Sequence, residues 1–368
     1  MHCEVKDRGI VKNKRVLVAM SGGVDSSVAA AILKDAGCEV IGATMKIWPK
    51  EHCEKHIAGS CCSSMDIEDA KKVCASLDVR HYTLDFEKIF REEVIDYFTR
   101  EYLSGRTPNP CIVCNEKIKF GALLKKAEEL GCDFIATGHY ARIEHNGSFR
   151  LKESADKNKD QSYVLFSLRR LALGKILFPI GGLKKEEVKV RAREIGLSVH
   201  AKKESQEICF VIDGNYADFI KEHCKVKSKT GDIVDVDGNV LGRHKGFWNF
   251  TIGQRKGLGI AHKNPLYVTG ISADKNLVVV GGSSETKKKK FIVKDVNWFC
   301  EKDKKGFESE VKIRYNHKKA KAFLKDVGGG NLEVDFEESQ TAITPGQAAV
   351  FYEDEYVVGG GWIDKVTE

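Results

Sequence analysis

Two short stretches of this chain carry residue types that can do chemistry. The first, "SGGVDS" at residues 21–26, follows the apolar run "RVLVAM" and precedes the alanine-rich run "SVAAAILKDAG". Glycines let a backbone approach a ligand closely, and the N-terminus of a helix favours an anion. The stretch has neither the Gly-Lys-Ser/Thr ending of a Walker A loop nor the G-x-G-x-x-G spacing of a dinucleotide fold. It predicts a phosphate-binding loop; the alternative is a plain glycine turn with Asp25 or Ser26 as a helix cap.

The second stretch, "NPCIVCN" at residues 109–115, places Cys111 and Cys114 three residues apart before a lysine-rich run. Taken alone, the pair is compatible with a structural disulfide, a zinc clip, a redox couple, cluster ligands or a sulfur carrier. A zinc clip needs two further ligands, and no matching Cys or His pair lies close in the sequence. We expect Asn115 to cap a helix over residues 116–130, whose N-terminus, with Lys117 and Lys119 nearby, favours the thiolate of Cys114.

A third stretch, "HCEKHIAGSCC" at residues 52–62, is a rival metal candidate. Its spacing fits no standard zinc module, so a loop over the active site with incidental or redox-active cysteines is the alternative. The candidate ligands are His52, Cys53, His56, Cys61 and Cys62.

The composition limits the class of protein. The N-terminal run "MHCEVKDRGIVKNKR" lacks the apolar core of a signal peptide, and no apolar run approaches the roughly 18 residues of a membrane span. We therefore expect a cytoplasmic protein without membrane contact, whose 12 cysteines are mostly reduced. The net charge of +7 permits a polyanionic partner without requiring one.

These stretches need a scaffold, and the pattern around them predicts one. Strands alternate with helices from Lys14 to about Phe210, which favours an α/β fold with a doubly wound parallel sheet. Shorter alternating runs with turn signals follow, typical of a small β-rich central domain and a C-terminal β-barrel. The expected domains are residues 1–212, 213–288 and 289–368.

The loop "SGGVDS" resembles that of the N-type ATP pyrophosphatases, which cleave ATP to AMP and pyrophosphate while adenylating a substrate. Further motifs follow in order: "GRTPNPCIVCNEKIKFG", "ATGHYAR", "KNKDQSYVLFSL", "LFPIGGLKKEEVKVRAREIGL", "SQEICFV", "TIGQRKGLGI" and "TPGQAAVFY". Together they resemble the tRNA-specific 2-thiouridylases over essentially the whole chain. The resemblance implies an ATP pyrophosphatase-type catalytic domain, ATP and Mg²⁺, and replacement of the C2 oxygen of a tRNA wobble uridine by sulfur after adenylation of that oxygen.

The resemblance also implies roles for individual residues. Cys114 is the nucleophile and Cys209 carries the persulfide, although "EICFV" alone is typical of a buried core cysteine. The implied ATP-binding residues are Ala19, Met20, Ser21, Gly22, Gly23, Val24, Asp25, Ser26, Met45 and Gly138. Asn109, Pro110 and Cys111 form the implied pocket for the target base. The implied tRNA contacts are His139, Lys159, Asp160, Gln161, Arg314, Tyr315 and Gln347, of which the last three hold the anticodon stem-loop. Arg314 and Tyr315 are expected to adjoin in a strand and point to opposite faces.

One departure from the family pattern leaves two mechanisms open. Many members carry an aspartate where this chain has Cys111. Cys111, Cys114 and Cys209 are therefore candidate ligands of a 4Fe-4S cluster whose open iron holds sulfide, as an alternative to a persulfide couple. An upstream donor such as a cysteine desulfurase relay supplies the sulfur in either case. Two rival functions share the loop: a small-molecule adenylating synthetase, and an RNA-binding or iron–sulfur scaffold that only holds nucleotide.

Overall fold

The computed structural model describes residues 11–47, 64–197, 199, 208–211, 214–303 and 305–368. The metal candidates His52, Cys53, His56, Cys61 and Cys62 lie outside the described residues. Internal contacts divide the chain into two units. The first unit comprises Met1–Val94, Cys111–Phe210 and Glu355–Val357, and the second comprises Ile95–Pro110, Val211–Asp354 and Val358–Glu368.

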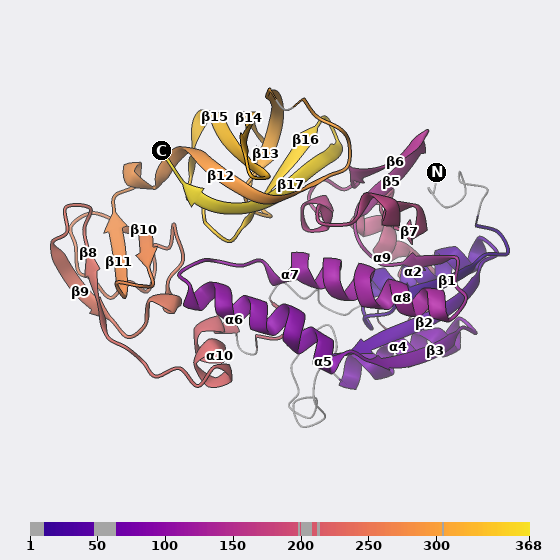
Figure 1. The fold of residues 1–368 in the computed structure, drawn as a ribbon. Helices are drawn as coiled ribbons and strands as arrows, with labels where there is room; N and C mark the ends of the chain where they lie inside the picture. The colour runs from indigo at the N-terminus through magenta and orange to yellow at the C-terminus, as the bar shows by residue number, and fades with distance from the viewer. Residues whose placement is uncertain (1–10, 48–63, 198, 200–207, 212–213, 304) are drawn as a thin grey trace. The chain divides into compact units, whose positions relative to one another are not determined.

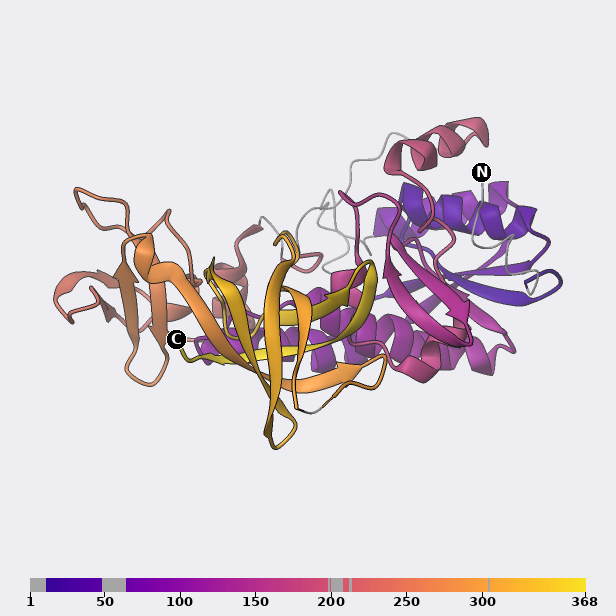
Figure 2. The same ribbon diagram turned by 90° about the horizontal axis from the view of Figure 1, so that it is seen from above.

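A parallel sheet forms the centre of the first unit (Figure 1). Its strands run in the order β3 (Arg80–Asp85), β2 (Glu39–Lys46), β1 (Arg15–Ala19), β4 (Phe134–Ala136) and β7 (Ile176–Leu177), and each of these neighbours pairs in parallel. Figure 2 shows α2 (Val24–Asp35) and α9 (Lys185–Glu194) on one side of the sheet and the helices of residues 110–129 on the other. The predicted doubly wound α/β fold is confirmed.

One core of this unit lies between the sheet and α2, α9 and α4 (Ser64–Ser76). Val16 and Val18 alternate along β1 and are fully buried in this core together with Val28 and Leu33 of α2. The alternation fits the period of two of a strand, and the alanine-rich face of α2 allows the helix to approach the sheet closely. This packing holds the start of α2 directly beyond the end of β1.

Two helical stretches depart from the pattern that the sequence predicts. Residues 87–103, whose pattern predicts a single helix, form α5 (Glu87–Phe90), a π-helical segment η1 (Arg91–Ile95) and α6 (Asp96–Leu103). The expected helix over residues 116–130 starts earlier, as α7 (Pro110–Val113), and continues through the π-helical segment η2 (Cys114–Ala122) into α8 (Leu123–Glu129). Hydrophobic periodicity does not distinguish a π segment from an α-helix.

An unpredicted hairpin follows β4 in the first unit. It consists of β5 (Ala141–Asn146) and β6 (Ser148–Glu153), paired antiparallel around Gly147. The Asn-Gly dipeptide is a known hairpin signal. Short 3₁₀ turns follow at η3 (Ser162–Leu165) and η4 (Arg170–Lys175).

The second unit contains the predicted β-rich parts. Its central sheet has the strand order β10 (Tyr267–Ser272), β11 (Leu277–Gly281), β8 (Gly231–Val234) and β9 (Val240–His244), beside α10 (Tyr216–His223) and the 3₁₀ turns η6 (Phe247–Asn249) and η7 (Ser284–Thr286). The barrel strands follow one another in the order β12 (Lys287–Trp298), β15 (Asn331–Thr341), β14 (Ala320–Gly328), β13 (Phe307–Lys312), β16 (Ala348–Glu353) and β17 (Tyr356–Val366). Because β12 also pairs with β17, the ring closes, and the predicted C-terminal barrel is confirmed. No helix among the described residues has the length and apolar character needed to cross a membrane.

Candidate active site

The loop between β1 and α2 is a tight turn with its own hydrogen bonds. The Ser21 N–H donates to Ser26 Oγ at 3.2 Å, and Ser26 Oγ donates to the Gly23 carbonyl at 3.2 Å. The cap residue Gly23 offers no side chain to bond the first turn of α2, so nothing at that position competes with a phosphate there. The predicted strand, glycine turn and helix are all present.

Two glycines bring other backbone segments against this loop. Gly22 has φ +66, and a Cβ there would lie 2.3 Å from the Asp66 carbonyl oxygen. Gly138, which follows β4, would place a Cβ 2.6 Å from the Ser26 nitrogen. Glycine at both positions therefore preserves a close backbone cradle around the start of α2.

The carboxylate of Asp25 is held by two side chains that sequence reasoning did not single out. Lys185 Nζ lies 2.8 and 2.9 Å from the two Asp25 oxygens, and the Tyr140 hydroxyl donates to Oδ1 at 2.9 Å. The Lys185 side chain is 6% exposed and that of Asp25 is 30% exposed. A buried ammonium and a partly open carboxylate are groups that can bind phosphate and Mg²⁺, respectively. Lys185 lies in "GGLKKEE", part of a motif quoted above, and Tyr140 lies in "ATGHYAR". Membership of these motifs was the sequence signal that could have identified both residues.

Met45 and Gly138 lie on the same edge of the sheet as the loop. Met45 is buried near the end of β2, Gly138 follows β4, and both strands flank β1 in parallel. The carboxyl edge of such a sheet is where doubly wound folds bind ligands. The structure thus brings these two predicted residues together with residues 21–26; their contact with ATP stays a prediction.

His139 is buried rather than open to a polyanion. Its ring packs 5.9 Å from both Phe120 and Phe178, and Nδ1 lies 2.7 Å from Thr137 Oγ1. Burial, and secondarily the charge of Lys119, lowers the pKa of His139 well below its usual value, so the ring is neutral at pH 7. Its predicted contact with tRNA is that of a neutral imidazole.

The cysteine stretch adopts a different conformation from the one expected. The helix begins at Pro110, so Cys111 lies in its first turn, Cys114 lies one turn further on, and Asn115 is not a cap. The N-cap expectation for Asn115 was wrong: this side chain is buried, and its amide donates to the Val164 carbonyl at 3.0 Å. Proline is favoured at a first helical position because its missing N–H costs nothing there.

The three candidate thiols differ in exposure but belong to the same unit. Cys111 is exposed, whereas Cys114 and Cys209 are half-buried, so Cys209 is not the fully buried core cysteine that "EICFV" suggests in isolation. The next residue, Phe210, is buried with its ring 5.8 Å from that of Phe90. Within the described part of the chain, no group of three or more His, Cys, Asp or Glu side chains is arranged to hold a metal ion.

The residues of the "KDQ" stretch carry local structural contacts, beginning with the Lys159 N–H, which donates to the Asp156 carbonyl at 3.0 Å. The buried Asp160 carboxylate accepts from the Ser154 N–H at 2.9 Å and from the Ser162 hydroxyl at 2.7 Å. Gln161 Oε1 accepts from the Tyr140 N–H at 2.9 Å, which links this turn to the residue that binds Asp25. Lys159 is half-buried, and the tRNA role of all three residues stays a prediction.

The predicted RNA residues of the barrel lie in turns. Arg314 and Tyr315 follow the end of β13, so the expectation that they adjoin in a strand was wrong. Arg314 donates to the Thr341 carbonyl at 2.9 Å, and Gln347 Nε2 donates to the Thr107 carbonyl at 2.8 Å. Burial and the charge of Arg314 lower the pKa of the nearby His317 to about 4, so this ring is also neutral.

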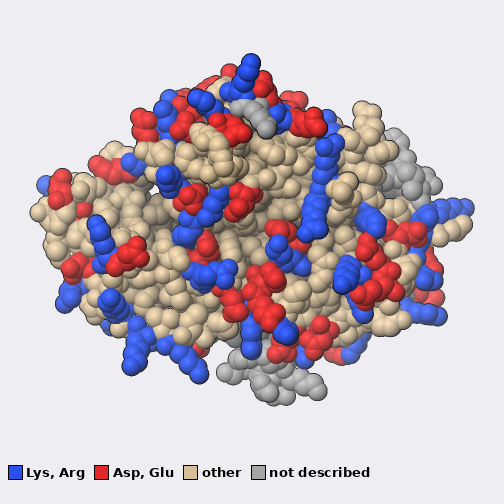
Figure 3. Space-filling view, in the orientation of Figure 1, with Lys and Arg blue, Asp and Glu red and all other residues tan. Residues whose placement is uncertain are grey.

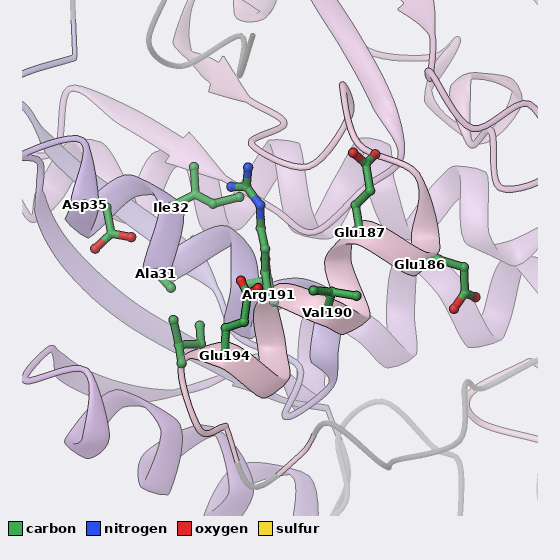
Figure 4. Close-up of a pocket in the computed structure, with 10 residues that line it drawn as sticks. Ala31, Ile32, Asp35, Glu186, Glu187, Val190, Arg191 and Glu194 are labelled. Atoms are coloured by element: carbon green, nitrogen blue, oxygen red, sulfur yellow. The ribbon is translucent and has the colours of Figure 1, made fainter. Parts of the chain in front are cut away.

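Neither the distribution of surface charge nor the groove described below identifies an RNA-binding surface. Basic and acidic side chains are interspersed over the face shown in Figure 3. A groove of about 580 Å³ lies between α2 and α9 (Figure 4), with Ile32 and Val190 beside Asp35 and Glu194. This groove starts at Val28, two residues after the nucleotide loop, and its rim is mainly acidic. It is unsuited to a polyanion.

The parallel sheet with its loop at the carboxyl edge, followed by a β-rich part and a closed barrel, is the fold of an ATP pyrophosphatase-like α/β protein with β-rich additions. Three family models match in order: a tRNA methyl transferase HUP domain over residues 14–213, a tRNA methyl transferase PRC-barrel domain over 217–282, and an aminomethyltransferase beta-barrel domain over 288–363.

Full-length relatives identify the family. The tRNA-specific 2-thiouridylase MnmA of Halothermothrix orenii is 48% identical over 354 residues, covering 95% of this chain and 99% of the relative. That of Clostridium acetobutylicum is 50% identical over 353 residues, with the same coverage. The chain belongs to the tRNA-specific 2-thiouridylase family, whose members are sulfurtransferases. Among solved structures, an NMN synthetase from Francisella tularensis aligns at a TM-score of 0.34 with 16% identity, over 54% of this chain and 69% of that one.

Proposed function

We propose that this chain uses ATP to replace the C2 oxygen of a tRNA wobble uridine by sulfur, acting in the cytoplasm. Family membership supports tRNA as the substrate, and the architecture of the nucleotide loop supports ATP. The observation that carries the proposal is the cradle at the start of α2, where Gly22 and Gly138 admit close backbone approach and Asp25 is held by Lys185. We further propose that the three domains comprise residues 1–212, 213–288 and 289–368.

The residues of the cradle suit an ATP-cleaving step. The first turn of α2 would hold the pyrophosphate portion of ATP, and Lys185 would offset its charge while orienting Asp25. Asp25 would contribute a carboxylate oxygen to Mg²⁺, and the bound ion would shield the charge that develops on pyrophosphate. Adenylation makes the C2 oxygen of the base part of AMP, a far better leaving group than oxide.

We propose a persulfide relay between Cys209 and Cys114. The terminal sulfur of the Cys209 persulfide attacks C2 of the adenylated base, and AMP leaves with the oxygen. The Cys114 thiolate then attacks the Cys209 sulfur, which releases the 2-thio base and forms a Cys114–Cys209 disulfide. An external dithiol reduces this disulfide, and an upstream persulfide donor such as a cysteine desulfurase relay reloads Cys209.

The iron–sulfur alternative is tested chemically. The described residues do not assemble a metal-binding group from Cys111, Cys114 and Cys209, and we derive no step through a cluster. Iron and acid-labile sulfide are measured on protein purified without oxygen, beside Cys111→Ser. The persulfide relay predicts 2-thiouridine formation by iron-free protein. About four irons per chain, lost in Cys111→Ser together with thiolation, would instead establish the cluster.

The adenylation step separates the proposal from its rivals. We expect pyrophosphate release from ATP to depend on added tRNA and to fall at least about 100-fold in Asp25→Asn. An equal rate of pyrophosphate release with and without tRNA would favour a small-molecule synthetase. Nucleotide binding without pyrophosphate release would favour a scaffold protein.

A further inference from the structure

The chain crosses between its two units beside both cysteine segments. One crossing falls between Pro110 and Cys111, and another falls between Phe210 and Val211, two residues after Cys209. Residues 95–110, which lead into the first crossing, belong to the second unit together with the barrel. The helix that carries Cys114 therefore continues directly from this segment of the second unit.

Arg106 attaches the segment to β17. Its Nη1 donates to the Asp364 carbonyl at 3.0 Å, and its Nη2 donates to the Ile363 carbonyl at 2.9 Å. Nε lies 2.8 Å from Glu101 Oε2, which fixes the guanidinium plane. Its side chain is only 19% exposed. Nη1 also lies 3.5 Å from Asp364 Oδ1. Only the planar fork of Arg can serve two backbone acceptors and two carboxylates in this arrangement.

Thr107 attaches the segment to the turn at residues 344–347. Its N–H donates to the Pro345 carbonyl at 2.9 Å, and its carbonyl accepts from Gln347 Nε2 at 2.8 Å. Gly346 has φ +92, and a Cβ there would lie 2.9 Å from both Thr107 N and Thr107 O. We call the contacts of Arg106 and Thr107 with residues 345–347 and 363–364 the barrel clamp.

The segment that connects the barrel clamp to the cysteine helix is short. The end of α6 closes with a Schellman motif, in which Gly105 has φ +74 and the Arg106 N–H donates to the Glu101 carbonyl at 3.0 Å. After Thr107 come Pro108, Asn109 and Pro110, and Pro110 already starts the helix. Two prolines with restricted φ in three residues make this connection stiff.

We propose that the barrel clamp positions the cysteine helix and transmits RNA binding at the barrel to Cys114. This inference rests on the proposed function, since Gln347 Nε2 is both the donor to Thr107 and a predicted RNA contact. When RNA accepts the hydrogen bond from the Gln347 amide, the Thr107 carbonyl loses this donor and the barrel clamp loosens. Arg106 is a positioning residue, because it acts through the segment and not on the reacting atoms.

The first test measures Cys114 alkylation by iodoacetamide, read by peptide mass spectrometry on the full chain without RNA. Opening the clamp by Arg106→Met is expected to raise the rate at least threefold, and Arg106→Lys is expected to restore part of the wild-type rate. Lys290→Met is the matched control, because Lys290 of β12 pairs with Asp335 and Glu368, neither of which belongs to the clamp. Cys132 in the same digest reports general unfolding. An unchanged Cys114 rate in Arg106→Met would overturn the proposal.

The second test measures hydrogen exchange of the peptide containing Thr107 with and without tRNA. The proposal expects at least threefold faster exchange with tRNA, because losing the Gln347 bond to the Thr107 carbonyl loosens the clamp and lets the bond from the Thr107 N–H to the Pro345 carbonyl open more often. Equal or slower exchange would overturn the RNA link. Neither readout requires thiolation, so the absence of 2-thiouridine from the wild-type reaction would defeat the proposed function separately.

Discussion

The nucleotide loop and the cysteine stretch are held in opposite ways. The loop at residues 21–26 is shaped largely by bonds among its own residues, such as Ser21 with Ser26 and Ser26 with Gly23. The cysteine stretch is positioned by residues far away in the sequence, through Asn115 with Val164 and through the barrel clamp. A locally determined site works as a fixed receptor for phosphate, whereas a remotely determined one is open to control by whatever moves its supports.

The first variant removes a remote support of the nucleotide loop, the Lys185 ammonium. Lys185→Met leaves the Asp25 carboxylate without the buried ammonium that lies 2.8 Å away, so we expect tRNA-dependent pyrophosphate release to fall about 100-fold. Lys189→Met is the control, since Lys189 forms an exposed pair with Glu186 in the same helix and should change the rate less than twofold. A loss of less than threefold in Lys185→Met would mean that the loop needs no remote support.

A second variant tests the close packing of the loop. Gly22→Ala combines a positive φ with a Cβ 2.3 Å from the Asp66 carbonyl, and we expect it to lower the free energy of unfolding by about 3 kcal/mol or more. Gly147→Ala has a similar φ of +71 but nothing within 4 Å, so it measures the backbone cost alone, about 1 kcal/mol. Urea denaturation of both variants gives the difference. Equal losses would show that the cradle is not tightly packed.

A third test uses His139, which touches both regions because it follows Gly138 and packs on Phe120 of η2. Its pKa is lowered in the folded protein, so the unfolded chain binds the proton more readily. Stability should therefore be fully present above about pH 6.5 and fall by about 1.4 kcal/mol per pH unit below it, until the folded pKa is reached.

The measurement compares urea unfolding of the wild type and His139→Leu at pH 7.0, 6.0 and 5.0. Leucine leaves the Thr137 hydroxyl without its ring partner, so the absolute stability drops and only the slope with pH is compared. We expect a shallower slope in the variant. Identical slopes would contradict the assignment of His139 as a buried neutral group.

The same contrast explains what the sequence alone could predict. The strand, glycine turn and helix around "SGGVDS" follow from local composition and period, and the structure has them at those residues. Lys185 lies 160 residues from Asp25, and no local pattern links the two. The helix start at Pro110 was missed because asparagine is a favoured N-cap residue, so Asn115 predicts a later start. Its burial, with the amide bonded to the Val164 carbonyl, is visible only in the structure.

The barrel illustrates the same limit. Its strands alternate clearly enough to be predicted, yet the end of β13 at Lys312 puts Arg314 and Tyr315 in a turn rather than a strand. Strand ends are decided by pairing with β14 and β16, which sequence periodicity does not contain. The attachment of Gln347 to Thr107 likewise joins residues 240 positions apart.

The central claim is that the Cys209 persulfide delivers sulfur to an adenylated tRNA base and that attack by Cys114 then releases the 2-thio base. The most direct test incubates the protein with tRNA, ATP, Mg²⁺, a persulfide donor and a dithiol, and measures 2-thiouridine by nucleoside mass spectrometry. The wild type and Cys132→Ser should form it, whereas Cys114→Ser should lose about 10³-fold of the rate while still releasing pyrophosphate. Formation of 2-thiouridine by Cys114→Ser at the wild-type rate would contradict the account.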